Sequence, residues 1–237
     1  MNHDVQRQPA AVVFDAVGTL INPDPPVAVA YGQAGRRHVS RLTNDECATR
    51  FHHAFAAEEA IDRDQFGWRT DELRERTRWR AIVERVFDDV ADGDALFEEL
   101  WNHFADPKHW RLIEGAAETW QALEARGVTL AIASNFDARL EAICRGLPPL
   151  QTCEHVFASS RLGVRKPSPD FFRRVGDELE VEPARLMMVG DDFDNDYRAA
   201  TAAGWSALLF DPLAKNTAEV PTLRSLRHLN ALFTPGG

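Results

Sequence analysis

The sequence predicts an α/β protein with a doubly wound parallel sheet as its core and an inserted all-helical segment. Two observations predict this fold. Short apolar runs alternate with helical stretches over the C-terminal half of the chain, which is typical of a parallel sheet with helices on both faces. An earlier apolar run near the N-terminus is separated from the others by a long stretch without a convincing strand.

The first predicted strand covers residues 10–14. This run, AAVVF, is short, continuous and rich in valine, as expected for a buried strand of a parallel sheet. It ends at Asp15, and Gly18 and Thr19 follow. Three prolines between residues 23 and 26 then mark a change of element, because proline cannot continue a central strand.

Residues from about 27 to 105 are predicted to be helical. Capping residues predict three helices there: 44–55 behind Thr43 or Asn44, 71–90 opened by Asp71, and 94–104 opened by Asp94. Asp106-Pro107 closes the segment with a turn signal. We therefore expect a helical cap domain over residues 23–107 and a core domain made of residues 1–22 and 108–237.

The remaining elements follow one another in strict alternation. Predicted strands cover residues 128–133, 155–158, 186–189 and 206–210, and predicted helices cover residues 116–125, 138–144, 169–179 and 194–203. Together with the first strand, this order predicts a Rossmann-like core, the inserted cap interrupting it after its first strand.

Composition limits the classes of function. The chain has 237 residues, 44% of them apolar, which is enough for one large domain or two modest ones. Its three cysteines are widely spaced and form no CxxC pair, so we expect neither disulfides nor a zinc site, and a reducing cytoplasm as the location. No apolar stretch is long enough to cross a bilayer or has the form of a secretion signal.

The formal net charge of −10 argues against nucleic acid or an anionic membrane surface as a partner, because both attract basic faces. A small anionic substrate stays possible, since a bound metal and a nearby lysine can outweigh the global field. The sequence leaves the oligomeric state open.

Polar residues follow the predicted strands at the points where the strands end. Asp15 follows the first strand, Ser134 and Asn135 the second, and an acidic run from Asp191 to Asp196 the strand at 186–189. Lys166, one of only three lysines, lies in a loop between strands. Each feature alone is typical of a helix cap, a turn or a solvated charge. Their order suggests one site, because active sites of open parallel sheets form beyond the carboxyl ends of the strands.

Four short stretches carry a resemblance to a known family. They read FDAVGTL, IASN, RKPSPDFF and VGDDFDND. In these motifs the chain resembles the haloacid dehalogenase superfamily, over residues 11–21 and about 112–211, and the helical insertion looks like the family's cap. The resemblance implies a hydrolase that works through a covalent aspartyl intermediate on a small molecule.

The resemblance also implies a magnesium site and a nucleophile. Asp15 would be the nucleophile. Asp15, Asp191 and the backbone carbonyl of Val17 would bind Mg²⁺, which prefers oxygen ligands. Asp196 would hold a metal-bound water or pair with Lys166.

Other residues would bind the substrate. Ser134 and the backbone amide of Asn135 would hold the oxygens of the transferring group, with Thr19 beside them. Lys166 would neutralise charge that develops there. Ser134 and Lys166 therefore join Asp15 as expected catalytic residues.

Val17 departs from the family pattern. Phosphatases of this superfamily usually carry at this position a second aspartate that protonates the leaving group, and losing a positioned acid costs about a hundred- to ten-thousand-fold in rate. A cap residue such as His52, His53 or Asp64, or a group on the substrate, would have to replace it, although His52 and His53 are more typical of a helix surface. Alkyl phosphates should suffer most, and phenolate or acyl leaving groups least.

Three interpretations stay open, in this order: a weak or specialised Mg²⁺-dependent phosphatase, a non-catalytic binding or regulatory relative, and a haloacid dehalogenase. The phosphonatase branch uses a cap lysine, and residues 27–105 contain no lysine. The dehalogenase branch needs no metal and lacks the acidic pair Asp191 and Asp196. Gly67, Trp68 and Arg69 lie between two predicted cap helices and are candidates for a substrate loop, although Trp68 is more typical of a core residue and Arg69 of a solvated charge.

Overall fold

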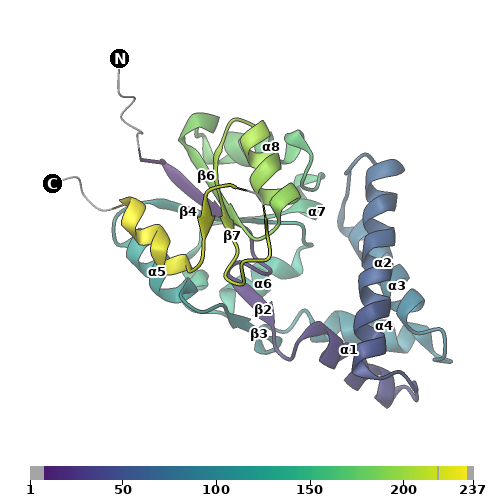
Figure 1. Cartoon of the computed structure of the whole chain (residues 1–237). Helices are drawn as coiled ribbons and strands as arrows, with labels where there is room; N and C mark the ends of the chain where they lie inside the picture. The colour runs from purple at the N-terminus through teal and green to yellow at the C-terminus, as the bar shows by residue number, and fades with distance from the viewer. Residues whose placement is uncertain (1–7, 218, 234–237) are drawn as a thin grey trace.

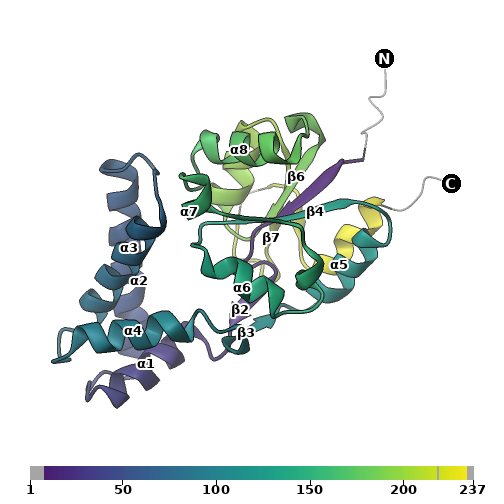
Figure 2. The same ribbon diagram turned by 180° about the vertical axis from the view of Figure 1, so that it is seen from behind.

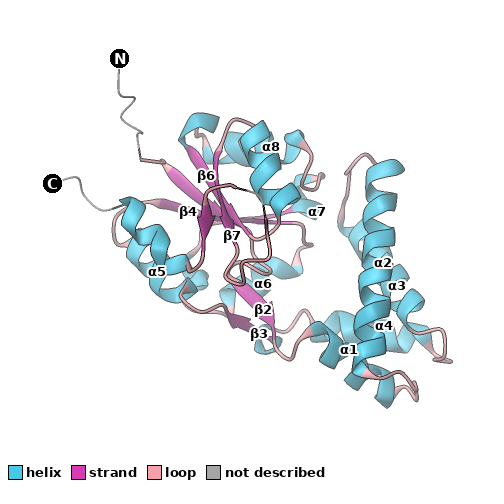
Figure 3. Ribbon diagram, in the orientation of Figure 1, coloured by secondary structure: helices cyan, strands magenta, loops and turns pink. Residues whose placement is uncertain are grey.

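The computed structural model describes residues 8–217 and 219–233. Its main sheet has six strands in the order β5-β4-β1-β6-β7-β8, and every neighbouring pair is parallel. The predicted doubly wound parallel sheet is therefore confirmed (Figure 3). The strands are β1 (Ala11–Phe14), β4 (Thr129–Ser134), β5 (His155–Ala158), β6 (Leu186–Gly190), β7 (Ser206–Phe210) and β8 (Thr222–Leu223).

Helices cover both faces of the sheet because successive side chains of each strand point to opposite faces. In β1, Val12 and Phe14 join the hydrophobic cluster on one face, and Ala11 and Val13 join the cluster on the other. The first face is covered by α5 (Ala116–Glu124), α6 (Arg139–Arg145) and η5 (Leu226–Phe233), and the second by α8 (Pro169–Leu179) and α9 (Ala199–Ala202). β1 therefore lies at the centre of the core.

A small antiparallel pair of strands was not predicted from the sequence. β2 (Ile21–Pro23) pairs with β3 (Trp110–Leu112), so the first of the three prolines ends a strand instead of preventing one. Pro23 is tolerated because it lies at the end of a two-stranded sheet, where its missing N–H breaks no central ladder. The two strands carry the chain out of the core and back into it (Figure 1).

Between β2 and β3, four helices pack on one another around a hydrophobic cluster of their own, which includes Tyr31, Ile82 and Phe97. They lie together beside the sheet in both views (Figures 1 and 2). The helices are α1 (Val27–Arg37), α2 (Asn44–Asp64), α3 (Glu72–Val86) and α4 (Gly93–His103). No helix of the described ranges is both long and apolar enough to cross a membrane. That residues 23–107 form a separate domain stays a prediction.

Capping decides where these helices begin. Thr43 and Glu46 form a capping box at the start of α2, and the Asp71 side chain accepts from the backbone of Arg74 in α3. Asp92, not the predicted Asp94, caps α4 by accepting from the Ala95 amide. In both α3 and α4, therefore, the capping aspartate accepts a hydrogen bond from the backbone amide three residues further along the chain.

The predicted ends of two helices are wrong. α2 continues nine residues beyond Phe55, to Asp64, because its last turns carry Glu58 and Asp62, which are buried in ion pairs with α3. α3 stops at Val86 instead of Val90.

The segment predicted as one helix over 194–203 divides into a π-helical turn, η4 (Phe193–Arg198), followed by α9. Shorter elements connect the rest: η1 (Pro107–His109), η2 (Leu150–Thr152), α7 (Ser159–Leu162) and η3 (Pro183–Arg185).

Candidate active site

The carboxyl edge of the sheet brings the predicted site residues together. Phe14 of β1 lies opposite Ile132 of β4 and Val189 of β6. Asp15 comes directly after β1, and Asp191 directly after β6. Because the three strands are parallel and in register, the residues that follow them meet at one edge.

Three carboxylates share this edge. Each of Asp15, Asp191 and Asp196 offers an oxygen atom, and these atoms lie within 4.8 Å of one another. Asp15 and Asp196 are buried, whereas Asp191 is exposed. This spacing allows one cation to contact several of them, which was the geometric requirement of the predicted metal site.

Lys166 is buried between two of these carboxylates. Its Nζ donates to Asp15 Oδ1 and to Asp196 Oδ1, each at 2.6 Å, and to the carbonyl of Ala133 at 3.1 Å. Burial lowers the pKa of the Lys166 ammonium, but the attraction of Asp15 and Asp196 outweighs burial and holds that pKa above its usual value. Lys166 is therefore a fixed cation beside Asp15, and Asp196 pairs with it, the second of the two roles predicted for Asp196.

The site carries more negative charge than its lysine compensates. Three carboxylates and one ammonium leave two negative charges. Loss of water around the Asp191 and Asp196 carboxyls raises the pKa of each, and repulsion from Asp15 adds to the effect. A divalent cation would balance the charge, and a set made only of oxygen atoms suits Mg²⁺.

Two glycines leave room for these carboxylates. Gly18 has a φ of +90°, and a Cβ atom there would overlap the Asp191 carboxyl group. A Cβ atom on Gly190 would overlap the Asp196 carboxyl group. Both positions therefore require glycine for a steric reason, and Gly18 requires it for its backbone conformation as well.

Thr19 is completely buried and contacts the acidic cluster. Its hydroxyl donates to Asp191 Oδ1 at 3.1 Å. In the described structure this side chain therefore orients Asp191, and the predicted contact between Thr19 and substrate stays a prediction.

Ser134 and Asn135 lie at the end of β4, but the Asn135 side chain has a contact that the sequence did not predict. Its Nδ2 donates to the Lys166 carbonyl at 2.9 Å, and its Oδ1 accepts from the Lys166 amide at 2.8 Å. This pair of bonds fixes the backbone of Lys166 against β4. Ser134 is buried, and its role toward substrate stays a prediction.

Val17 is half-buried, and its apolar side chain supplies no acid next to Asp15. Of the residues considered as a replacement acid, His52 and His53 are exposed on α2, and Asp64 pairs with its neighbour Arg63 at 2.7 Å. No contact of these three side chains with Asp15 occurs within the described residues. The structure therefore offers no replacement among them.

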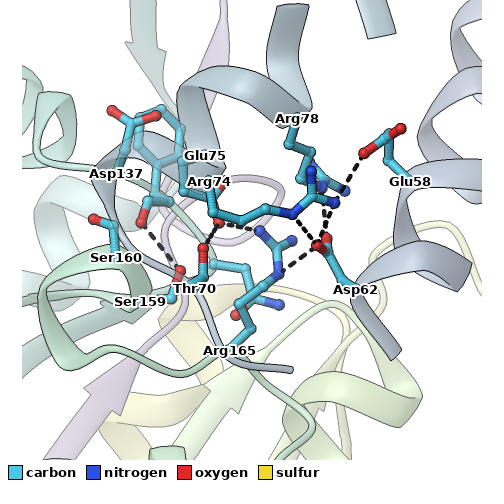
Figure 4. A network of polar contacts seen from close by, with 12 residues as sticks. Glu58, Asp62, Thr70, Arg74, Glu75, Arg78, Asp137, Ser159, Ser160 and Arg165 are labelled. Carbon is cyan, nitrogen blue, oxygen red and sulfur yellow. Dashed lines mark hydrogen bonds and ion pairs between the residues drawn. The ribbon is translucent and has the colours of Figure 1, made fainter. Parts of the chain in front are cut away.

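A second group of charged residues joins the helical segment to the core, and we name it the cap–core cluster (Figure 4). Arg165, next to Lys166, is 1% exposed and pairs with Glu75 of α3 and, at 3.7 Å, with Asp62 of α2. The remaining members lie on α2 and α3 and form ion pairs with one another, with Asp62 or with Arg165: Glu58, Glu59, Arg74, Arg78 and Arg85.

The candidate substrate loop at Gly67, Trp68 and Arg69 lies against the core next to this cluster. The Trp68 carbonyl accepts from the Arg165 amide at 2.8 Å, and Arg69 forms an isolated β-bridge with Val164. Trp68 is partly buried and packs against the hydrophobic cluster that α8 and α9 cover on one face of the sheet. In this structure the loop therefore forms part of the contact between the helical segment and the core.

The fold and the carboxylates at its edge are those of a class of hydrolases that the comparisons identify. A family model for haloacid dehalogenase-like hydrolases matches residues 9–204. The chain belongs to this family, as its motifs predicted. It is 30% identical to haloacid dehalogenase-like hydrolase domain-containing protein 3 of Bos taurus, an alignment that covers 97% of this chain and 94% of the relative.

Another relative is named for its reaction. The chain is 29% identical to a ribulose-1,5-bisphosphate 5-phosphatase of Halopiger xanaduensis, over 88% of this chain and 87% of the relative.

Solved structures share the fold at lower identity. The HAD hydrolase YfnB of Bacillus subtilis, bound to magnesium, superposes with a TM-score of 0.74 at 20% identity, covering 95% of this chain and 99% of that one. The L-2-haloacid dehalogenase of Xanthobacter autotrophicus with chloropropionic acid covalently bound superposes with a TM-score of 0.72 at 20% identity, covering 95% and 98%. At these identities the likeness concerns the fold alone.

Proposed function

We propose that this hydrolase is a Mg²⁺-dependent phosphatase that acts on a small phosphorylated molecule through an aspartyl phosphate. One observation carries the proposal: the oxygens of three carboxylates lie within 4.8 Å of one another, and one buried lysine compensates only one of their charges. Such a cluster is unfavourable without a cation. The dehalogenase branch, which needs no metal, has no use for it.

The proposed ligands are Asp15, Asp191 and the backbone carbonyl of Val17, with Asp196 holding Lys166 and, through water, the metal. Bound Mg²⁺ would withdraw charge from the phosphoryl oxygens. Thr19 orients Asp191 through the hydrogen bond described above.

Asp15 is the proposed nucleophile. One of its carboxylate oxygens attacks phosphorus, the bond from phosphorus to the ester oxygen breaks, and the leaving oxygen keeps the electron pair. Water then attacks the phosphorus of the aspartyl phosphate, which releases inorganic phosphate and restores Asp15. Lys166, held beside Asp15 at 2.6 Å, together with Ser134 and the Asn135 amide, would bind the phosphoryl oxygens.

Proton transfer is the weak point of this mechanism. Val17 cannot protonate the leaving oxygen, so the proton must come from water. Leaving groups that are stable as anions should therefore react well, and alkyl alcohols poorly. The phosphatase named among the relatives supports the proposal.

A panel of substrates tests the proposal. Acetyl phosphate, phenyl phosphate, glycerol 3-phosphate and 2-chloropropionate are incubated with the enzyme, with Mg²⁺ or with a chelator, and phosphate or chloride release is measured. We expect Mg²⁺-dependent phosphate release, fastest from acetyl phosphate and slowest from glycerol 3-phosphate. Chloride release that persists with the chelator would contradict the phosphatase proposal and show that the protein is a haloacid dehalogenase.

A haloacid dehalogenase is a further candidate function, because Val17 is apolar and that branch also lacks the second aspartate. In that reaction Asp15 would displace halide from carbon, and no leaving group would need a proton. Silence toward the whole panel, together with Mg²⁺ binding, would favour the non-catalytic relative.

A further inference from the structure

An apolar cavity lies between the helical segment and the core, and Val17 forms part of its wall. It encloses about 250 Å³. Nine of its sixteen lining residues are aromatic, among them Tyr31, Phe51, Trp79 and Trp101. All four helices of the segment contribute to the wall, and so do β2, β3 and the end of β4.

The cavity borders the candidate active site at two residues. Val17 follows the proposed nucleophile by two positions, and Asn135 holds the backbone of Lys166. Both line the cavity. A phosphoryl group on Asp15 would therefore have its leaving group directed past Val17, into the aromatic walls.

The charge of the cavity argues against a second phosphate or a polyhydroxylated group. Arg139 is its only charged lining residue, and that guanidinium is already engaged. It donates to both oxygens of Asp137 at 2.8 and 2.7 Å and to the Trp101 carbonyl at 3.1 Å, and it lies 3.5 Å from the centroid of the Trp101 ring. No uncompensated cation of the described lining residues is left to bind an anion.

The size of the cavity matches an aromatic group. A dry cavity of roughly 150 Å³ lined by apolar side chains takes up benzene, so about 250 Å³ holds one ring or two fused rings.

From these contacts we infer that the cavity binds the leaving group of the substrate and that this group is aromatic, so that the substrate is an aryl phosphate. The inference rests on the proposed function and explains Val17. A phenolate leaves readily without a proton from an acid, whereas an aspartate at position 17 would place a charge against an apolar ring.

The experiment separates the cavity from the chemistry by comparing two activated substrates. 2-Naphthyl phosphate would fill the cavity, and acetyl phosphate, which also needs no acid, would not. Phe51→Ser opens the wall, and Val27→Phe fills the cavity from α1. Phe66→Ser is the matched control, since Phe66 is a partly exposed aromatic residue of the same segment and lies outside the cavity.

We expect each cavity variant to lower kcat/KM for 2-naphthyl phosphate by about 10-fold or more while leaving acetyl phosphate unchanged. Phe66→Ser should leave both unchanged. Equal losses on both substrates, or no loss on either, would overturn the inference and leave the proposed phosphatase intact. Val27→Phe guards against an effect of unfolding, because it adds apolar volume instead of removing it.

A binding measurement tests the cavity without any turnover. Calorimetric titration with 2-naphthol should show saturable binding to the wild-type protein and to Phe66→Ser, and weaker binding to Val27→Phe. If no phosphate ester is hydrolysed but 2-naphthol binds in this pattern, the proposed function fails and the aromatic site stands. If 2-naphthol does not bind, the inference fails whatever the activity.

Discussion

The protein contains two clusters of charged side chains, partly buried, that differ in their balance of charge. The cap–core cluster contains four carboxylates, Glu58, Glu59, Asp62 and Glu75, and four guanidinium groups, Arg74, Arg78, Arg85 and Arg165. The active-site cluster contains three carboxylates and one ammonium. One cluster is neutral within itself, and the other is not.

The difference in charge balance shifts the pKa of the carboxyl groups in opposite directions in the two clusters. Burial by itself would raise the pKa of Glu75, but Arg165 and Arg78 outweigh it and lower that pKa. At the sheet edge, repulsion adds to desolvation, and the pKa of Asp191 is raised. A balanced cluster stabilises a contact between two parts of a protein, whereas an unbalanced one is suited to a ligand of opposite charge.

The two clusters are also neighbours in the chain. Arg165 belongs to the first and Lys166 to the second, and the backbone of Arg165 is held by the Trp68 carbonyl of the loop between α2 and α3. Arg165 therefore holds the helical segment against the core, and the next residue, Lys166, contacts Asp15.

The largest expected effect comes from removing the nucleophile. Asp15→Asn keeps the shape of the site but should lower kcat by about a million-fold, since a carboxamide cannot form the aspartyl phosphate. It should also abolish trapping by beryllofluoride, a phosphoryl mimic, measured by fluorine nuclear magnetic resonance. Asp177→Asn, an exposed aspartate of α8, is the control. Trapping that survives in Asp15→Asn would exclude the assigned role.

A fourth carboxylate at position 17 would increase the excess of negative charge at the sheet edge. Val17→Asp supplies the missing acid and should raise kcat for glycerol 3-phosphate by about 100- to 10,000-fold in Mg²⁺. Val17→Asn has a similar shape without an acid and should give no gain. An unchanged rate in Val17→Asp would count against a phosphatase limited by proton transfer.

Removing one cation from the balanced cluster should destabilise the fold. Arg165→Met removes the ion-pair partner of the buried Glu75, whereas Asp62 keeps Arg74 and Arg78. We expect a loss of about 3–5 kcal/mol in the free energy of unfolding, measured by urea denaturation. Arg161→Met is the control, in the short helix α7 that precedes this loop, because the Arg161 side chain is 61% exposed and its pair with Glu72 is long. Similar small losses in both variants would mean that the cap–core cluster contributes little.

The smallest expected effect is the pH dependence of metal binding. Raised pKa values mean that the metal-free site retains protons on Asp191 and Asp196 at pH values where ordinary carboxyls have lost them. Mg²⁺ must displace these protons, so its affinity should fall as the pH falls, by up to about tenfold per pH unit for each proton displaced. Calorimetric titrations from about pH 5 to about pH 8 measure this slope.

The stability of the metal-free protein should depend on pH in the opposite direction: it should fall, whereas the Mg²⁺ affinity rises, as the pH rises. A carboxyl whose pKa is raised by folding stabilises the folded state below its unfolded pKa and loses that contribution as the pH rises through the raised value. The melting temperature without Mg²⁺ should therefore fall with rising pH in this window, and Mg²⁺ should restore it increasingly. A Mg²⁺ response that persists in Asp191→Asn would argue against this site.

The sequence by itself determined the sheet and the ends of its strands. Valine-rich runs and their alternation with helices are local patterns, and a residue that follows a parallel strand must lie at the carboxyl edge. Asp15, Ser134 and Asp191 could therefore be assigned to one edge without coordinates. Lys166 could be added because its motif resembles that of a known family.

Only the tertiary structure decided which side chains meet across the chain. The bonds from Asn135 to Lys166, the pairing of Arg165 with Glu75, and the aromatic cavity all join residues that are distant in sequence. An aromatic residue such as Phe51 has the same spacing in its helix whether it packs in a core or lines a cavity. The difference depends on the volume left between helices, which is set by packing and carries no local signal.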